Sequence, residues 1–181
     1  MIISLFETPL HIIECDLKLD SLCSRIKDFQ TKIESSYRSN SGGYQGHNFE
    51  DENLIKCIKD NVPQRSDKPL LDFKIQSWVN INGKGHWNDV HDHCDDGVML
   101  SGIFYVRCPE NSGGIRLYDT RINVSRNYSK YYEEDRGTYM KLNPHPNLML
   151  FFPPWLLHLV EPNQSNEERI SVAFNISYPS F

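Results

Sequence analysis

The sequence predicts an α+β, mainly β fold in which N-terminal helices pack on an antiparallel barrel or jelly roll. Two observations lead to this prediction. Apolar residues recur at helical spacing in the N-terminal third, and from Leu71 onwards they alternate with polar residues. Because short strands and turns then follow with no helix between them, an antiparallel sheet is favoured over a parallel one.

Two helices are expected before the β region. The first runs roughly from Ser21 to Ser36 with Asp20 as its N-cap. Its apolar stripe follows spacings of three and four: Leu22, Ile26, Phe29 and Ile33. The second helix is expected over Glu50 to Asn61, and Pro63 ends it.

The β region is expected to contain a series of short strands separated by turn-forming segments. They are Leu71 to Ile81, Met99 to Val106, Ile115 to Tyr118, Leu148 to Phe152 and Arg169 to Ser177. The polar, tyrosine-rich stretch from Asn123 to Lys141 has no clear period and is either a lid or a solvated insertion.

Length and charge narrow the class of protein. At 181 residues the chain fits one domain, residues 1–181, with helical support over about 1–65 and a β core over about 70–181. The net charge is −5 and the basic residues are scattered, so we expect no nucleic-acid partner. The sequence leaves open whether the protein forms a homodimer.

The N-terminus and the cysteines indicate a cytoplasmic protein. MIISLFETPL lacks the pattern of a signal peptide, and no segment approaches the ~20 apolar residues of a membrane span. We therefore expect no membrane partner. The five cysteines are widely spaced and form no C-x-x-C pair, which suits a reducing compartment.

The segment NDVHDHCDDG places two histidines, His91 and His93, one residue apart. In extended chain, residues i and i+2 point the same way, so both imidazoles can face one cavity. A third ligand from a distant strand would complete a facial metal site, and His158 in WLLHLVEP is the natural candidate. The alternatives are a polar surface loop for the pair and a core histidine for His158.

The order of motifs from about Asp72 onwards resembles the iron and 2-oxoglutarate-dependent oxygenases of the prolyl-hydroxylase group. The motifs are Gly85 before His91, LSGIFYV with Tyr105, SGGIRLYD at Ser112 to Asp119, LMLFFPPWLLH ending at His158, and RISVAFNIS beginning at Arg169. WVNIN, the H-x-H pair and the SNSGGYQ segment at Ser39 to Gln45 are similar to an uncharacterised subfamily of marine bacteria and phages.

This resemblance implies a double-stranded β-helix of the jelly-roll and cupin type. It also implies a dioxygenase that uses Fe(II), O₂ and 2-oxoglutarate, hydroxylates its substrate and releases succinate and CO₂. The implied metal ligands are His91, His93 and His158. The resemblance assigns co-substrate binding to the RxS pair Arg169 and Ser171 and to Tyr105. Asn80 either lines the pocket or serves as a β-bridge or turn side chain.

One position departs from the wider family, because His93 stands where most members have Asp. Either the site has three histidines, or the loop shifts so that His93 and Asp95 form the H-x-D pair. In a three-histidine site, Asp92 or Asp95 can offset the extra positive charge from the second shell of ligands.

Two other functions remain as alternatives. One is a three-histidine cupin dioxygenase that needs no co-substrate, and Arg169 with Ser171 argues against it. The other is a non-catalytic jelly-roll binding protein. The substrate, a small molecule or a peptidyl residue, is not identified by the sequence.

Overall fold

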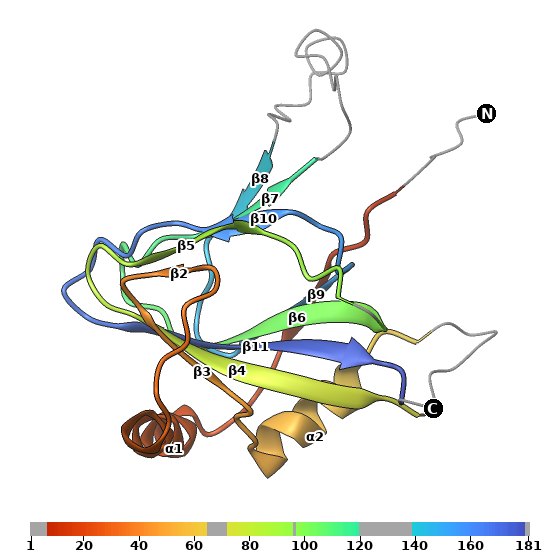
Figure 1. The fold of residues 1–181 in the computed structure, drawn as a ribbon, viewed down its shortest axis with the longest axis horizontal. Helices are drawn as coiled ribbons and strands as arrows, with labels where there is room; N and C mark the ends of the chain where they lie inside the picture. Colours follow the sequence, from red (N-terminus) through yellow and green to blue (C-terminus); the bar gives the residue numbers. More distant parts are fainter. Residues whose placement is uncertain (1–6, 65–71, 96, 120–138, 180–181) are drawn as a thin grey trace, which may run out of the picture.

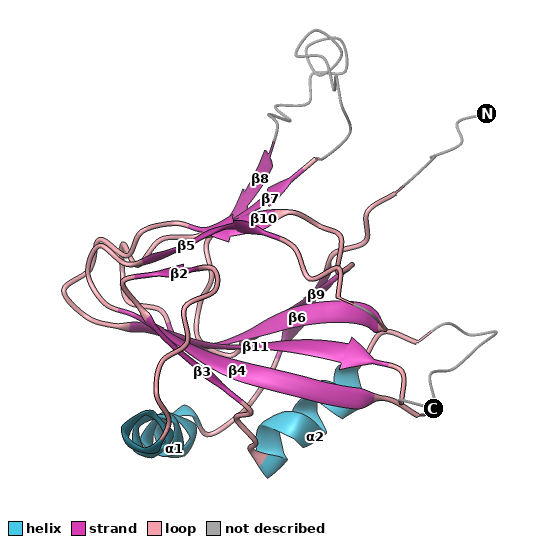
Figure 2. Ribbon diagram, viewed as in Figure 1, coloured by secondary structure: helices cyan, strands magenta, loops and turns pink. Residues whose placement is uncertain are grey.

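The computed structural model describes residues 7–64, 72–95, 97–119 and 139–179. Two antiparallel sheets face each other, and two helices cover the outer face of the larger sheet (Figures 1 and 2). The larger sheet has the order β1 (His11–Glu14), β9 (Leu148–Phe152), β6 (Val98–Arg107), β11 (Arg169–Ser177), β4 (Lys74–Asn82) and β3 (Tyr44–His47). The smaller sheet has the order β2 (Asn40–Ser41), β5 (Trp87–His91), β10 (His158–Val160), β7 (Ile115–Tyr118) and β8 (Tyr139–Leu142).

The predicted fold class is confirmed. The helices, α1 (Leu19–Lys32) and α2 (Glu52–Asn61), pack against a core formed by one face of the larger sheet. On β11 the residues of that face are Ile170, Val172, Phe174 and Ile176, as the alternation predicts. A second apolar cluster, which includes Ile103 of β6, Phe152 of β9 and Leu117 of β7, lies between the two sheets.

The polar face of β11 is also buried, which alternation alone does not predict. Arg169 is 1% exposed, Ser171 4% and Asn175 6%. These side chains lie on the opposite side of the strand from Val172 and face the space between the sheets, because successive strand residues point to opposite faces. Polar side chains in the interior of a sandwich are a sign of a binding site.

The start of the first helix differs from the prediction. The helix begins at Leu19, Lys18 occupies the N-cap position without a capping side chain, and Asp20 lies in the first turn. Leu19 packs on the core, so the apolar stripe starts before Asp20. The helix ends at Lys32 rather than Ser36, because Ile33 is extended and 41% exposed. The second helix is capped by the side chain of Asp51, which accepts a hydrogen bond from Leu54 N at 3.0 Å.

The predicted strands over 115–118, 148–152 and 169–177 have the observed bounds, and two others differ by a few residues at their ends. Six strands were not predicted: β1, β2, β3, β5, β8 and β10. The N-terminal part is therefore not purely helical, since it supplies strands to both sheets. Of the stretch from Asn123 to Lys141, the residues before Tyr139 lie outside the described part of the chain. No helix among the described residues is long and apolar enough to cross a membrane.

Candidate metal centre and its pocket

Three histidines meet between the sheets. His91 ends β5 and His158 begins β10, and the two residues are cross-strand partners in the antiparallel pair. His93 follows in the bend after β5, where its backbone N–H donates to Pro154 O at 2.8 Å. One ring nitrogen of each histidine lies within 4.8 Å of the others. The structure thus brings together the three residues that the sequence singles out as metal ligands.

Backbone carbonyls fix the orientation of two of these rings. His91 Nδ1 lies 2.6 Å from Asp89 O, and His158 Nδ1 lies 2.8 Å from Leu156 O. When Nδ1 carries the proton and donates it to a carbonyl, the lone pair is left on Nε2. His93 Nε2 and His158 Nε2 are 3.3 Å apart, so the free nitrogens converge on one point.

Burial keeps the three imidazoles neutral. Desolvation lowers the pKa of His158 to about 3 and that of His93 to about 4, and the nearby His91 lowers both further. Desolvation also lowers the pKa of His91, although Asp89 and Asp92 act in the opposite direction. Neutral nitrogen donors with free lone pairs suit a divalent first-row metal, so the donor set fits Fe(II).

Neither acidic alternative belongs to this cluster. Among the described residues, the group of mutually close ligand atoms contains the three histidines and neither Asp92 nor Asp95. Asp92 instead accepts a hydrogen bond from Cys94 N at 3.1 Å. A shift to a His93 and Asp95 pair is therefore not the arrangement that the structure shows.

A row of polar side chains on the larger sheet faces the same interior. Ser171 pairs with Tyr105 on one neighbouring strand and with Asn80 on the other. Directly paired residues point to the same face of a sheet, so all three lie side by side. The row continues to Gln45, whose Nε2 donates to Asn80 Oδ1 at 3.2 Å. Asn80, Arg169 and Ser171 line one cavity with the three histidines.

Arg169 is held by backbone oxygens but keeps a free donor. Its Nη1 donates to the carbonyls of Ser112 and, at 3.0 Å, Glu161. The Gly-Gly turn makes room for this contact, because a Cβ on Gly113 would lie 2.7 Å from Glu161 O and 3.0 Å from Nη1. Nη2 is buried and has no hydrogen-bond partner in the described part of the chain. No ion pair of Arg169 with a described carboxylate is found either.

Tyr105 is a second buried side chain whose polar group has no hydrogen-bond partner in the part of the chain that the structure describes. Its side chain is 0% exposed, and its hydroxyl lacks a partner among the described residues. Burial raises the pKa of Tyr105, while the charge of Arg169 acts to lower it, so the two groups are close neighbours. A buried cation and a buried hydroxyl without partners cost free energy unless a ligand supplies an anion. The carboxylate of a dicarboxylic co-substrate fits this need.

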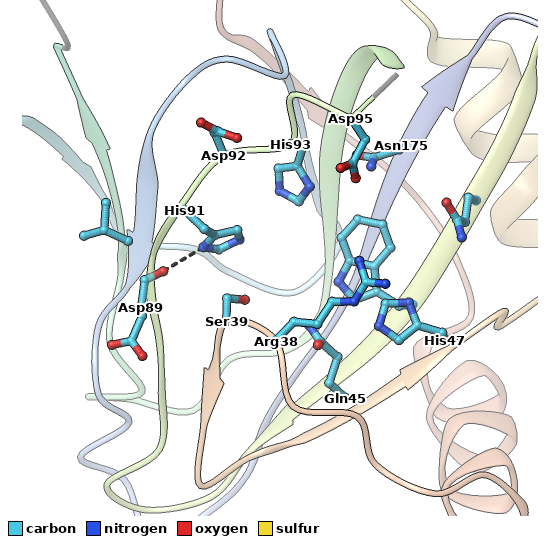
Figure 3. A pocket seen from close by; sticks show the side chains of 13 residues that line it. Arg38, Ser39, Gln45, His47, Asp89, His91, Asp92, His93, Asp95 and Asn175 are labelled. Carbon is cyan, nitrogen blue, oxygen red and sulfur yellow. Dashed lines mark hydrogen bonds between the residues drawn. The ribbon is translucent and has the colours of Figure 1, made fainter. Parts of the chain in front are cut away.

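A cavity of about 400 Å³ opens beside the histidines (Figure 3). Its wall includes Arg38, His47, Trp78 and Asn175, none of which the sequence identifies as site residues. For Asn175 a signal existed, because it follows Arg169 and Ser171 at even spacing on one strand. Arg38 and His47 gave no signal, because they lie in or next to short polar strands whose pairing is not readable from the sequence.

Comparison with known proteins identifies the family to which this chain belongs. A family model described as "Putative 2OG-Fe(II) oxygenase" matches residues 76–175, more than half of the chain. The chain belongs to this family. It is therefore a 2-oxoglutarate-dependent Fe(II) oxygenase, an oxidoreductase whose cofactors are Fe(II) and 2-oxoglutarate. No curated protein has a significantly similar sequence.

Solved structures confirm the double-stranded β-helix fold. A prolyl-4-hydroxylase from Pseudomonas putida is 14% identical with a TM-score of 0.65, covering 94% of this chain and 93% of its own. The collagen prolyl hydroxylase of Paramecium bursaria Chlorella virus-1, solved with 2-oxoglutarate, is 17% identical with a TM-score of 0.62, covering 94% and 96%. A Trichoplax adhaerens prolyl hydroxylase is 16% identical with a TM-score of 0.66, covering 93% and 83%.

Proposed function

We propose that this protein hydroxylates a carbon atom of its substrate and converts 2-oxoglutarate to succinate and CO₂. The observation that carries the proposal is the pair of buried donors without a partner among the described residues, Arg169 Nη2 and Tyr105 OH. Arg169 lines one cavity with the three histidines, and Tyr105 is the cross-strand partner of Ser171, which lines the same cavity. When bound, Fe(II) and 2-oxoglutarate supply the activation of O₂ that the side chains themselves cannot provide.

His91, His93 and His158 would hold the metal. Their neutral imidazoles need no deprotonation near neutral pH, and the carbonyls of Asp89 and Leu156 fix two rings in the orientation for binding. Three neutral ligands leave the full charge of the ion in place. Asp92 is near enough to act on both His91 and His93, and its carboxylate reduces that charge from outside the ligand set.

Arg169, Ser171, Tyr105 and Asn80 would bind the co-substrate. The guanidinium is anchored through Nη1 and offers Nη2 to a carboxylate, so little freedom is lost on binding. Ser171 and Tyr105 offer hydroxyls from neighbouring strands, and Asn80 is held by Gln45 at the end of the row. These groups orient the co-substrate and exclude water from the anion.

The proposal is tested by measuring succinate from ¹³C-labelled 2-oxoglutarate with Fe(II), ascorbate and O₂. Wild type is expected to form succinate in a metal-dependent reaction. Tyr105→Phe keeps the ring and removes the hydroxyl, and we expect its affinity for 2-oxoglutarate to fall by about tenfold. Tyr178→Phe, at a side chain that is 60% exposed and does not line either cavity at the histidines, serves as the control for hydroxyl removal.

Three results would contradict the proposal. O₂ uptake that proceeds without 2-oxoglutarate would favour a three-histidine dioxygenase of the cupin type. No binding of Fe(II) by folded protein would favour a binding protein without activity. Equal 2-oxoglutarate affinity in wild type and Tyr105→Phe would remove Tyr105 from the co-substrate site.

A further inference from the structure

The mouth of the pocket carries opposite charges on its two sides. Figure 3 shows Asp95 and Asn175 close to His93, and Arg38 with His47 on the other side. Neither Asp95 nor Arg38 forms an ion pair with another described residue. The two charges therefore face the same space without neutralising each other.

Asp95 differs from the two other acids of the pocket wall. Asp89 accepts a hydrogen bond from Trp87 Nε1 at 2.7 Å, and Asp92 accepts one from Cys94 N at 3.1 Å. The carboxylates of both point away from the middle of the pocket in Figure 3. Asp95 makes two backbone hydrogen bonds, to His93 O at 2.7 Å and from Val98 N at 3.2 Å, which fix its position. Its carboxylate has no hydrogen-bond partner among the described residues.

Arg38 is the cation of the opposite side. Desolvation lowers the pKa of His47, and the charge of Arg38 lowers it further, so His47 is neutral and the guanidinium lies nearby. The backbone of Arg38 is held by a hydrogen bond from its N–H to Asn40 Oδ1 at 3.1 Å. The guanidinium itself is exposed and offers a planar set of donors to a carboxylate.

Beside these charges, the Nε2 atom of His47 is buried without a hydrogen-bond partner among the described residues, and two donor side chains reach the pocket. Asn175 is 6% exposed, and its Oδ1 accepts from Ser101 Oγ at 2.8 Å, but its Nδ2 has no hydrogen-bond partner among the described residues. Trp78 is 8% exposed and stacks on His47 at 5.8 Å between ring centroids. Its Nε1 is likewise without a described partner. Both side chains line the pocket, so they can donate to a ligand bound there, and the buried His47 Nε2 needs such a partner most.

We propose that the substrate is a free α-amino acid bound as a zwitterion, with its carboxylate at Arg38 and its ammonium group at Asp95. This inference rests on the proposed function, because it concerns the substrate of the same site. The cavity volume of about 400 Å³ is in the range of small-molecule sites. The side chain of the amino acid lies against Trp78, which contacts the metal-site residue His93 at 5.5 Å between centroids. A carbon of the substrate is thereby placed next to the metal centre.

A residue within a peptide chain fits this mouth less well. Its amino and carboxyl groups are amides, so it offers no charge to either Asp95 or Arg38. Both charged groups would be partly desolvated by the bound chain without gaining a partner, which is unfavourable. The same reasoning predicts that blocking either end of a free amino acid weakens its binding.

The test is calorimetric titration of the full-length protein, loaded with Mn(II) and 2-oxoglutarate without O₂, with each proteinogenic L-amino acid. We expect at least one to bind, and we expect its amide and its N-acetyl derivative each to bind at least about tenfold more weakly. In Arg38→Gln the preference for the acid over the amide should disappear. In Asp95→Asn the preference for the free amine over the N-acetyl form should disappear.

Matched controls keep the outcomes separate. Arg107→Gln and Asp16→Asn remove the same charges away from the pocket and should retain both preferences. If the wild-type protein binds neither Mn(II) nor 2-oxoglutarate, the proposed function is refuted. Intact co-substrate binding with no amino acid bound, or with the doubly blocked N-acetyl amide bound as tightly as the free form, would overturn the zwitterion inference alone.

Discussion

Acidification should destabilise the metal-free protein through its buried histidines. Burial lowers the pKa of His158 to about 3 and of His93 to about 4, whereas an unfolded histidine titrates near 6.5. Between these values the unfolded chain binds protons that the folded protein cannot. Stability is therefore unaffected by these groups well above pH 6.5 and is lost as the pH falls below it.

The expected magnitude follows from these pKa values. Between about pH 7 and about pH 5.5, each of these two histidines lowers the free energy of unfolding by about 1.2 kcal/mol. The two together lower it by about 2.5 kcal/mol. The pKa of His91 is also lowered by burial, so it adds a loss of the same sign. Saturating Fe(II) should oppose the loss by binding the neutral imidazoles of the folded state.

Urea denaturation of the metal-free protein at several pH values measures this effect. His158→Leu should reduce the difference in unfolding free energy between the two pH values by about 1.2 kcal/mol. His145→Gln, at a side chain that is 53% exposed and away from the site, should reduce it far less. An unchanged pH dependence in His158→Leu would show that this histidine is not buried as a neutral base.

Three further predictions follow from the packing and the co-substrate site. Gly102→Ala should lower the free energy of unfolding by about 1–3 kcal/mol in urea denaturation, because its Cβ would meet Leu150 O at 2.6 Å and the ring of Phe174; an unchanged midpoint would contradict this packing. Asp51→Ala should lower the free energy of unfolding in urea denaturation by at least about 1 kcal/mol, because it removes both the N-cap of α2 and the ion pair with Arg25. Asp51→Asn keeps the cap and should lose less, and an equal loss in both variants would contradict the capping role. Ser171→Ala should weaken 2-oxoglutarate binding severalfold in calorimetry with an unchanged thermal midpoint, and equal affinity would exclude its hydroxyl from the site.

The sequence predicts the long regular elements of the fold well. Strand β11 alternates apolar and polar residues over its whole length, and the bounds of β7 and β9 follow from apolar runs between turns. Strands β2, β3, β5 and β10 are two to five residues long, too short for a clear alternation of apolar and polar residues, so their formation depends on pairing with distant strands. This pairing is tertiary information that a local pattern does not contain.

Some residues of the candidate site were also predictable from the sequence, and others were not. The three histidines and the Arg169 and Ser171 pair were found from spacing and motif order, and the structure places all of them around one cavity. Their roles in binding stay predictions. The free donors of Arg169 and Tyr105 depend on which carbonyls surround them, and Arg38 reaches the pocket from a loop. Neither feature has a sequence signal.

Anaerobic titration of the protein with Fe(II) and 2-oxoglutarate, followed by visible absorption, tests most directly whether the three imidazoles and the buried cation form one site. Wild type should develop the weak charge-transfer band of 2-oxoglutarate bound to Fe(II), and His145→Ala should keep it. His158→Ala, folded by circular dichroism, should lack the band. A band of unchanged intensity in His158→Ala would contradict the proposed metal centre.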